Sequence, residues 1–297
     1  MSDLSSELDD RIARLAADRA SGATAILEEV LRILADARAG GLPVLPVARA
    51  ICRAQPSMAS VWTACMETVA SRNDPGRFER FAQRAARSHA AAARFGLELL
   101  APSDADEPVR LVTLSASRSV QAVFEAVRRR RPLRVACSES RPATEGRGLA
   151  MTLAAAGITV TVFSDAAISH ALDASDAVLV GADAVGASWF LNKSGTHMLA
   201  AAASHQGVPV YVVATRDKFV GPEIASRLVI REGAPDEIWE SPPAGVQVRN
   251  PYFEYVPLDL VTGVISDAGV LGVGMVPDVC AAAHDDATVE ALAAIIG

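Results

Sequence analysis

The chain has 297 residues, of which 51% are hydrophobic and 21% are charged, and this balance excludes a disordered or collagen-like protein. No apolar run approaches the roughly 18 residues that a membrane span needs, and the acidic start lacks the basic-then-apolar pattern of an export signal. A net charge of −7 argues against nucleic-acid binding by bulk charge, and four cysteines without CxxC spacing are too few for a disulfide scaffold. We therefore expect a cytoplasmic protein with a large core, no membrane contact and no direct binding of nucleic acid.

Helical patterns occupy the first part of the chain, from residue 4 to about residue 104. Apolar residues recur at three- to four-residue spacing at Leu4, Leu8, Ile12 and Leu15, and again at Ile26, Leu27, Val30, Leu31 and Leu34. Gly40-Gly41 predicts the end of the second helix. Pro43 and Pro46 then predict a connector between helices.

Two further helices are predicted before the pattern changes. Ser57 is expected to cap a helix from Met58 to about Ala70. The tripeptide Asn73-Asp74-Pro75 is expected to begin a long helix that ends near Leu100. The first part of the chain therefore predicts an all-helical unit.

A polar, turn-forming segment at 101–108 is the best candidate for a domain boundary, which predicts a helical domain at 1–105 and a second domain at 106–297. Beyond it, short β-branched runs alternate with helical patterns: Arg110–Leu114, helix 117–130, Leu133–Cys137, helix 146–156, Ile158–Phe163, helix 165–172, Ala177–Gly181, helix 194–206 and Val208–Ala214. This alternation is typical of βαβ crossovers and a buried parallel sheet. The fold class is therefore α/β, with an N-terminal helical domain followed by a Rossmann-like domain.

Ligands bind such sheets at the carboxyl ends of the strands, so the residues that follow each run are the candidates for a site. The first run is followed by Ser115, Ser117 and Arg118, at a helix start that suits an anion or is an ordinary serine cap. The second is followed by Arg141 and by Glu145-Gly146, which opens the next helix. Arg141 either binds a phosphate or pairs at the surface with Glu139 or Glu145.

Charged and polar residues follow the later strands as well. Asp183 follows the fourth strand and is either a general acid or base or a turn cap. Asn192-Lys193 precedes Ser194-Gly195-Thr196 at the start of a helix, but the segment does not match a Walker phosphate loop. Lys193 and Lys218, which follows the fifth strand, are the only lysines in the chain. Together these residues favour a site for a small phosphorylated ligand.

An ordered set of motifs makes a family resemblance specific: SESRPATEGRGLA, VTVFSDAAI, DAVLVGADAV, NKSGT, GVPVYVVA and NPYFEYVPLDLVTGVISDAGVL. This set resembles the translation initiation factor 2B family, which joins regulatory subunits of that factor to two sugar-phosphate isomerases, acting on methylthioribose-1-phosphate and ribose-1,5-bisphosphate. The resemblance is dense from Arg110 to Val279, and the family also carries an N-terminal helical domain. It implies a homodimer formed through the sheet domain, which the apolar segment Tyr252–Val273 also favours.

The resemblance also implies roles for individual residues. The isomerases use a cysteine and an aspartate as acid and base. Their aspartate matches Asp183, where the non-catalytic alpha subunit has a glutamate, whereas Ser115 stands where their cysteine is expected. Ala116-Ser117-Arg118 is closer to the alpha subunit, and Glu145 replaces a glutamine of some isomerases.

The phosphate contacts of the family match Arg141, Asn192 and Lys193, whereas Arg19 matches a family arginine only weakly because it is displaced. Cys137 is expected to be a small core residue rather than a substitute thiol. We expect no cofactor. We also expect no metal, because no two histidines share ligand spacing with a carboxylate.

Two interpretations remain open. One is an aldose–ketose isomerase acting on a sugar 1-phosphate, favoured by Asp183 and the set of phosphate contacts. The other is a non-catalytic protein that binds sugar phosphates or nucleotides, as a regulatory alpha subunit does, favoured by Ser115 and by Ser117-Arg118.

Overall fold

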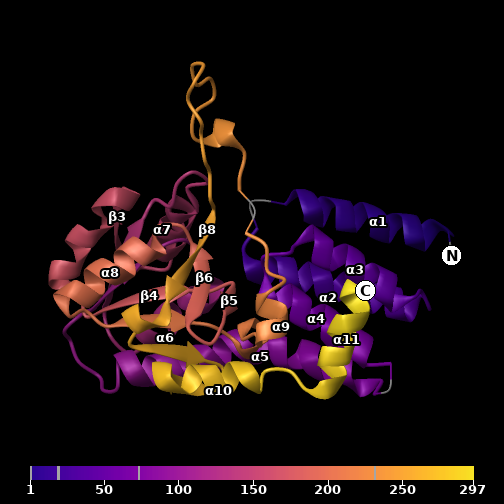
Figure 1. Cartoon of the computed structure of the whole chain (residues 1–297). Coiled ribbons are helices and arrows are strands. Elements are labelled where there is room, and N and C mark those ends of the chain that lie inside the picture. Colours follow the sequence, from indigo (N-terminus) through magenta and orange to yellow (C-terminus); the bar gives the residue numbers. More distant parts are fainter. Residues whose placement is uncertain (1, 19–20, 73, 231) are drawn as a thin grey trace.

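The computed structural model describes residues 2–18, 21–72, 74–230 and 232–297. A layer of helices lies beside a Rossmann-like α/β unit, and the C-terminus lies among the N-terminal helices (Figure 1). The helical layer begins with α1 (Ser2–Ala17), α2 (Ala23–Ala39), α3 (Val44–Ala54), α4 (Ala59–Ala70) and α5 (Gly76–Leu100). None of the described helices is both long and apolar enough to cross a membrane.

The N-terminal helices form where the apolar spacing predicts them, but two of their boundaries differ from expectation. Gly40 caps α2 as predicted. Pro46, expected in a connector, lies in the first turn of α3, where a backbone N–H would have no helical partner and proline is tolerated. Met58 rather than Ser57 precedes α4, and no side chain caps that helix. Asn73 lies outside the described residues.

A seven-stranded sheet forms the centre of the second part of the chain, with strand order β10-β9-β7-β4-β1-β2-β3. Its strands are β1 (Val109–Thr113), β2 (Leu133–Ser138), β3 (Thr159–Phe163), β4 (Ala177–Gly181), β7 (Val210–Val213), β9 (Gly263–Ser266) and β10 (Gly269–Gly272). All neighbours pair in parallel except β9 and β10. The mostly parallel α/β sheet predicted from the alternating runs is therefore confirmed.

Helices cover both faces of this sheet, which is why its central strands are buried. On one face, α6 (Arg118–Arg128) and α7 (Glu145–Ala155) pack with part of α5 over apolar strand residues such as Leu111 and Val135. On the other face lie the 3-10 helix η1 (Asp165–Ala174), α8 (Thr196–Gln206) and α10 (Val276–Ala281). The segment expected as an ordinary helix at 165–172 is thus a 3-10 helix.

A second, smaller sheet is not predicted by the alternating pattern. It has three antiparallel strands in the order β5-β6-β8: β5 (Ala184–Val185), β6 (Trp189–Lys193) and β8 (Phe253–Pro257). Leu191 of β6 pairs with Tyr255 of β8, so residues distant in sequence define this sheet. It places Asn192 and Lys193 at the end of β6, directly before α8.

Two helices connect the helical layer to the rest of the molecule. Phe78 and Phe81 of α5 lie in the helical core, whereas Ala92 of the same helix lies in a sheet core. The C-terminal helix α11 (Asp286–Ile296) contributes Leu292 and Ile295 to the helical core. The division at residues 105 and 106 stays a prediction, and helices on each side of it pack across it.

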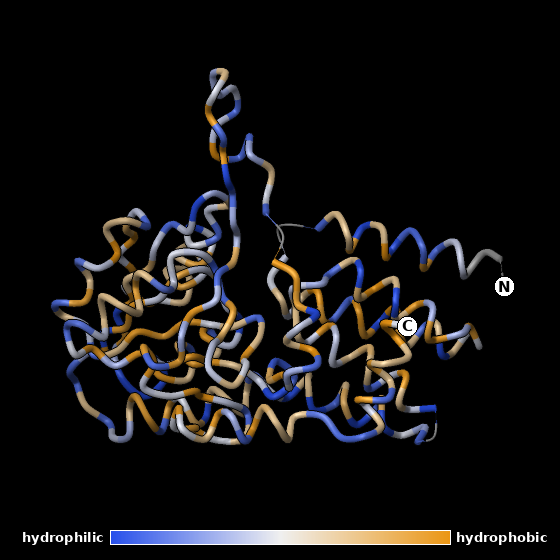
Figure 2. The backbone as a smooth tube through the Cα atoms, in the orientation of Figure 1, coloured by the Kyte–Doolittle hydropathy of each residue, from blue (hydrophilic) through white to orange (hydrophobic). Residues whose placement is uncertain are grey.

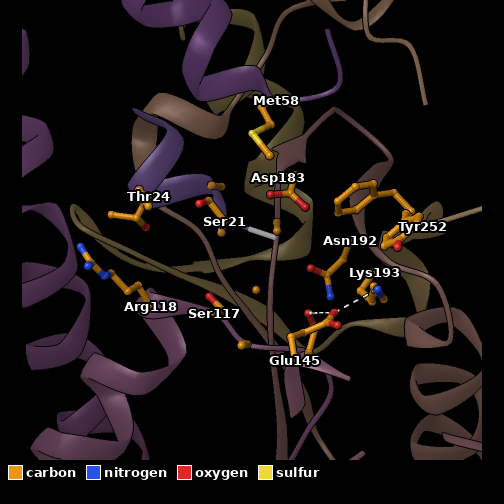
Figure 3. Close-up of a pocket in the computed structure, with 18 of the residues that line it drawn as sticks. Ser21, Thr24, Met58, Ser117, Arg118, Glu145, Asp183, Asn192, Lys193 and Tyr252 are labelled. Carbon is orange, nitrogen blue, oxygen red and sulfur yellow. Dashed lines mark hydrogen bonds and ion pairs between the residues drawn. The ribbon is translucent and has the colours of Figure 1, made fainter. Parts of the chain in front are cut away.

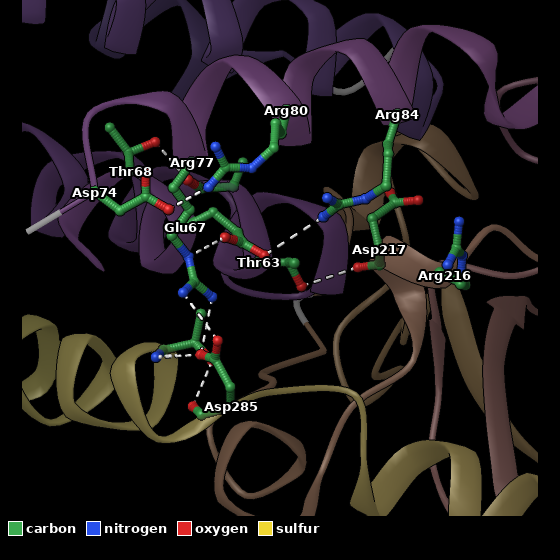
Figure 4. Close-up of polar contacts among 12 residues, drawn as sticks. Thr63, Glu67, Thr68, Asp74, Arg77, Arg80, Arg84, Arg216, Asp217 and Asp285 are labelled. Atoms are coloured by element: carbon green, nitrogen blue, oxygen red, sulfur yellow. Dashed lines mark hydrogen bonds and ion pairs between the residues drawn. The ribbon is translucent and has the colours of Figure 1, made fainter. Parts of the chain in front are cut away.

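An ion-pair network joins α4, α5 and α11 (Figure 4). The Arg77 guanidinium donates to Glu67 of α4 and, through two nitrogens, to Asp285 before α11 at 2.8 and 2.9 Å. Asp285 also caps α11 by accepting from the Thr288 N–H at 3.0 Å. These contacts, led by the hydrogen bonds from Arg77, lower the pKa of Asp285 to about 2.

An arm at residues 232–250 extends away from both cores (Figure 1). Hydrophobic and hydrophilic segments alternate along it (Figure 2). Glu232 and Arg249 form an ion pair near its base, and Ile238, Trp239 and Val246 are exposed.

Candidate functional site

The candidate site is a cavity of about 350 Å³ between the carboxyl ends of the strands and the start of α2. Its walls come from the loop after β1 (114–118), the end of β4 and the residues after it (181–183), the end of β6 (192–193) and the residues around the start of α2 (21–25). Tyr252 and Phe253 close another side, next to Lys193 (Figure 3). This location agrees with the rule that parallel sheets bind ligands at their strand ends.

Most of the residues predicted from the strand ends come together here. The cavity is lined by Ser115, Ser117, Arg118, Glu145, Asp183, Asn192 and Lys193. Arg141 and Gly146 are not among its lining residues. Their predicted contact with a ligand stays a prediction.

Arg141 is exposed, and the side chain of Asp165 fixes the loop that carries it. Asp165 accepts hydrogen bonds from the backbone N–H groups of Ser140 and Arg141, each at 2.7 Å. The surface pairs considered for Arg141 are taken by other residues, since Glu139 pairs with Arg147 and Glu145 pairs with Lys193.

Gly146 has a packing role beside the site. A β-carbon on Gly146 would lie 1.9 Å from the backbone oxygen of Ser138. Only glycine therefore allows α7 to begin this close to the end of β2, and this approach brings Glu145 to the cavity.

Asp183 is held through its backbone and surrounded by two lysines. Its N–H donates to the carbonyl of Leu191 at 2.8 Å, and its carbonyl accepts from the Ala59 N–H at 3.1 Å. Burial raises the pKa of the Asp183 carboxyl, while the charges of Lys218 and Lys193 act in the opposite direction. A carboxyl that keeps its proton at a higher pH than an ordinary carboxyl is suited to general acid catalysis.

Lys218 is fixed at the same place by a backbone contact. Its Nζ donates to the carbonyl of Ala182 at 2.6 Å, and the residue is only 5% exposed. The two lysines of an arginine-rich chain thus both line the cavity.

Ser115, Glu145 and Lys193 form a chain of polar contacts along another wall. Ser115 Oγ donates to Glu145 Oε1 at 3.0 Å, and Lys193 Nζ lies 3.0 Å from the same oxygen. Glu145 Oε2 is buried without a hydrogen-bond partner among the described residues. The Lys193 ammonium also lies 4.3 Å from the centre of the Tyr252 ring, a cation–π contact.

Three non-glycine residues with left-handed backbone lie in the two loops beside this chain: Ser115 (φ 66°), Ser140 (φ 62°) and Thr144 (φ 56°). Such conformations cost roughly 1–3 kcal/mol each and cluster at functional sites. The Ser115 N–H donates to Ser140 Oγ at 2.9 Å, so one strained loop holds the other.

Two helix N-termini reach the cavity and suit an anion. Ser117 precedes α6 and accepts from the Val120 N–H at 3.5 Å. Gly181 makes room for Ser117, because a β-carbon there would lie 2.6 Å from the serine Oγ. The other N-terminus is that of α2, which Gly22 precedes without a side-chain cap.

Arg118 links these two helices and is partly neutralised. Its guanidinium pairs with Glu28 of α2 at 2.6 Å, and its side chain is 56% exposed. Arg118 therefore lies at the cavity edge, whereas Lys193 and Lys218 are buried in its wall.

Sequence reasoning missed the lining residues from α2, Met58, Gln121 and Tyr252. A partial signal existed for α2, because Ser21 and Gly22 follow the weak arginine match at Arg19, which itself lies outside the described residues. Met58 and Gln121 carry no chemical signal that points to a site.

Cys137 is a core residue, as expected. It is fully buried in the sheet core, does not line the cavity, and burial raises its pKa to about 11. No cluster of metal-ligating side chains occurs among the residues that the structure describes.

Fold and site together define a Rossmann-like α/β protein with a polar cavity at its strand ends. The chain matches the initiation factor 2 subunit family over residues 11–272 and belongs to this family. The resemblance inferred from the motifs is therefore confirmed.

Relatives from both branches of the family are similar to this chain. A ribose 1,5-bisphosphate isomerase of Methanocaldococcus jannaschii is 32% identical over 165 residues, covering 54% of this chain and 54% of that protein. A putative translation initiation factor eIF-2B subunit 2-like protein of Pyrococcus furiosus is 32% identical over 242 residues, covering 77% and 80%. The match spans about half the length of the isomerase.

Solved structures share the fold at low sequence identity. A translation initiation factor eIF-2B of Pyrococcus horikoshii OT3 superposes with a TM-score of 0.76 at 24% identity, covering 89% of this chain and 96% of that chain. A 5-methylthioribose 1-phosphate isomerase from the same organism gives a TM-score of 0.69 at 20% identity, covering 93% and 88%.

Proposed function

We propose that this chain is an aldose–ketose isomerase acting on a sugar 1-phosphate, similar to ribose-1,5-bisphosphate or methylthioribose-1-phosphate. The observation that carries the proposal is Asp183, a carboxyl with a raised pKa in a cavity that also holds two lysines. Similarity to a ribose 1,5-bisphosphate isomerase supports the same reaction class.

The reaction requires an acid and a base but no oxidant. The bond between C1 and the ring oxygen breaks, and the ring oxygen takes a proton. The hydrogen on C2 moves to C1, so C1 is reduced and C2 is oxidised. The C2 hydroxyl loses its proton and becomes the ketone. Asp183 supplies the proton to the ring oxygen, because its raised pKa keeps it protonated at higher pH than an ordinary carboxyl.

The phosphate is bound by charge and by backbone N–H groups. Lys193 and Asn192, at the end of β6, face the cavity with the N-termini of α2 and α6. These are the groups that bind phosphates in other α/β proteins. The cavity of about 350 Å³ lies within the range of small-molecule sites, roughly 300–1,000 Å³.

A second candidate function is a non-catalytic protein that binds a sugar phosphate or nucleotide. The observation that favours it is Ser115, because a serine hydroxyl is a far poorer acid than the thiol expected there. The longer match to an eIF-2B subunit 2-like relative agrees with this alternative.

A panel of aldose 1-phosphates followed by phosphorus NMR separates the two functions. The isomerase proposal expects one member of the panel to be converted to a ketose phosphate. Thermal-shift measurements on the same panel are expected to show stabilisation by the phosphorylated sugars and not by the free sugars. If the phosphorylated sugars stabilise the parent and Ser115→Cys but neither protein converts them, the non-catalytic binding function is the one that remains. Equal shifts from phosphorylated and free sugars would contradict both.

A further inference from the structure

We infer that Ser115 and Glu145 together are the base of the reaction: Ser115 Oγ takes the proton of the substrate's C2 hydroxyl while passing its own proton to Glu145. The inference rests on the proposed isomerase function and names the group that does the work of the missing thiol. Ser115 touches the substrate, and Glu145 is the positioning residue that acts through it.

The direction of the serine hydrogen bond carries the argument. A serine hydroxyl has one proton and two lone pairs, and Ser115 directs its proton to Glu145 Oε1 at 3.0 Å. Its lone pairs therefore remain for a donor in the cavity, which Ser115 lines. A substrate hydroxyl is such a donor.

The negative charge of Glu145 is paired with the ammonium group of Lys193. Lys193 Nζ lies 3.0 Å from the same Oε1, and the lysine is only 4% exposed. A nucleophile or base is activated in this way in other enzymes, where a hydroxyl is bonded to a base that a third group orients. Glu145 Oε2 is buried and has no hydrogen-bond partner among the described residues.

The relay is held in place by two loops. Ser115 is fixed by its N–H bond to Ser140 Oγ at 2.9 Å and by a left-handed backbone with φ 66°. Glu145 begins α7, whose position depends on Gly146. A relay built on such constrained residues loses little entropy when the substrate binds.

Asp183 and Glu145 occupy different parts of the cavity wall, one beside Met58 and the other beside Lys193 (Figure 3). Burial favours the protonated form of Asp183, whereas Glu145 is ion-paired. Two carboxyl groups with such different surroundings divide into an acid and a base.

The proton balance closes with these two groups. Asp183 gives a proton to the ring oxygen as the bond to C1 breaks with its electron pair remaining on oxygen. The hydrogen on C2 moves to C1 with its bonding electrons. The O–H bond of the C2 hydroxyl then breaks, its electrons form the ketone, and its proton passes to Ser115 as the serine proton moves to Glu145. After the product leaves, solvent returns a proton to Asp183 and takes up the proton held by Glu145.

The test compares Glu145→Gln with Glu139→Gln in the isomerase assay. Glu139 lies in the same loop but pairs with Arg147 and does not line the cavity, so its variant is the control. Glu145→Gln is expected to lower kcat by roughly 10²–10⁴-fold with KM nearly unchanged, the range expected for loss of a general base. The control is expected to keep the kcat and KM of the parent.

Ser115→Ala gives a second measurement that does not depend on the folding of the Glu145 variant. Ser115→Ala is expected to lower kcat to the same extent as Glu145→Gln. The double variant is expected to have a kcat no lower than that of the less active single variant, because each substitution disrupts the same relay. If the parent isomerises a sugar phosphate and Glu145→Gln keeps the parent kcat, this inference is wrong and the isomerase function stands. If the parent turns over no sugar phosphate, both are wrong.

Discussion

Asp183 lies near two ammonium groups, and burial nevertheless raises its pKa. Burial outweighs the charges of the two lysines, of which Lys218 also donates to the Ala182 carbonyl and Lys193 also pairs with Glu145. Because its pKa is raised by burial, ionising the Asp183 carboxyl in the folded protein lowers the stability of the fold. Such a cost at a single residue is typical of a functional site.

Asp183→Asn is expected to increase the free energy of unfolding at pH 8, because the amide cannot ionise in the buried position. The native state binds the Asp183 proton more tightly than the unfolded chain, so the parent loses stability as the pH rises from the ordinary carboxyl value through the raised pKa. The gain from the substitution is therefore expected to shrink as the pH falls to 4. Urea denaturation of both proteins at the two pH values measures it, and an equal or larger gain at pH 4 would contradict the assignment.

At the same scale, the sequence predicts which residues reach the strand ends but not where each side chain points. Asp183 and Lys193 could be assigned because the carboxyl ends of parallel strands meet at one edge. The contact that fixes the Arg141 loop could not be predicted, since Asp165 lies 24 residues further along the chain and carries no sign of it. The bond between Ser115 and Glu145 is likewise visible only once β1 and β2 are paired.

At the scale of elements, the close approach of α7 to β2 decides whether Glu145 reaches the cavity. The approach depends on the absence of a side chain at Gly146. Gly148, two residues further along the same helix, has open space around it. The two glycines of α7 therefore have different roles despite their similar position in the sequence.

Gly146→Ala is expected to lower the free energy of unfolding by about 1–3 kcal/mol and to weaken ligand binding, because the new methyl group would displace the Ser138 carbonyl. Gly148→Ala is the matched control and is expected to gain roughly 0.5–1 kcal/mol, since alanine favours a helix interior. Chemical denaturation followed by circular dichroism measures both changes. A stabilised Gly146→Ala variant would show that the helix start does not need this contact.

Most elements of the large sheet could be predicted because short β-branched runs alternate with helical patterns. The sheet of β5, β6 and β8 could not, because β5 has two residues and β6 pairs with a strand about sixty residues later. The local spacing of apolar residues cannot predict a pairing between strands so far apart in the sequence. The 3-10 character of η1 is similarly invisible, since apolar residues at these spacings fit either kind of helix.

At the scale of the whole molecule, the helical layer and the sheet share elements. α5 packs in both cores, and α11 returns the end of the chain to the helical layer. The cavity lies between these parts, because α2 supplies one wall and the strand ends supply the others. The site therefore requires both the helical layer and the sheet.

A homodimer stays a prediction. The segment that suggested it is covered in part by the chain itself, since Val256, Val264 and Ile265 are fully buried, whereas Tyr255 and Val270 are exposed. Light scattering at micromolar concentration is expected to give twice the mass of the 31.0 kDa chain. A single species of 31.0 kDa would contradict the prediction.

The central claim is that Asp183 carries the acid step of a sugar-phosphate isomerisation. The most direct measurement is phosphorus NMR of the aldose 1-phosphate panel with the parent and with Asp183→Asn, with ligand-induced thermal stabilisation recorded on the same samples. The account predicts a ketose phosphate product with the parent, no product with the variant, and nearly equal stabilisation of both proteins. Turnover by Asp183→Asn at the parent rate would contradict it.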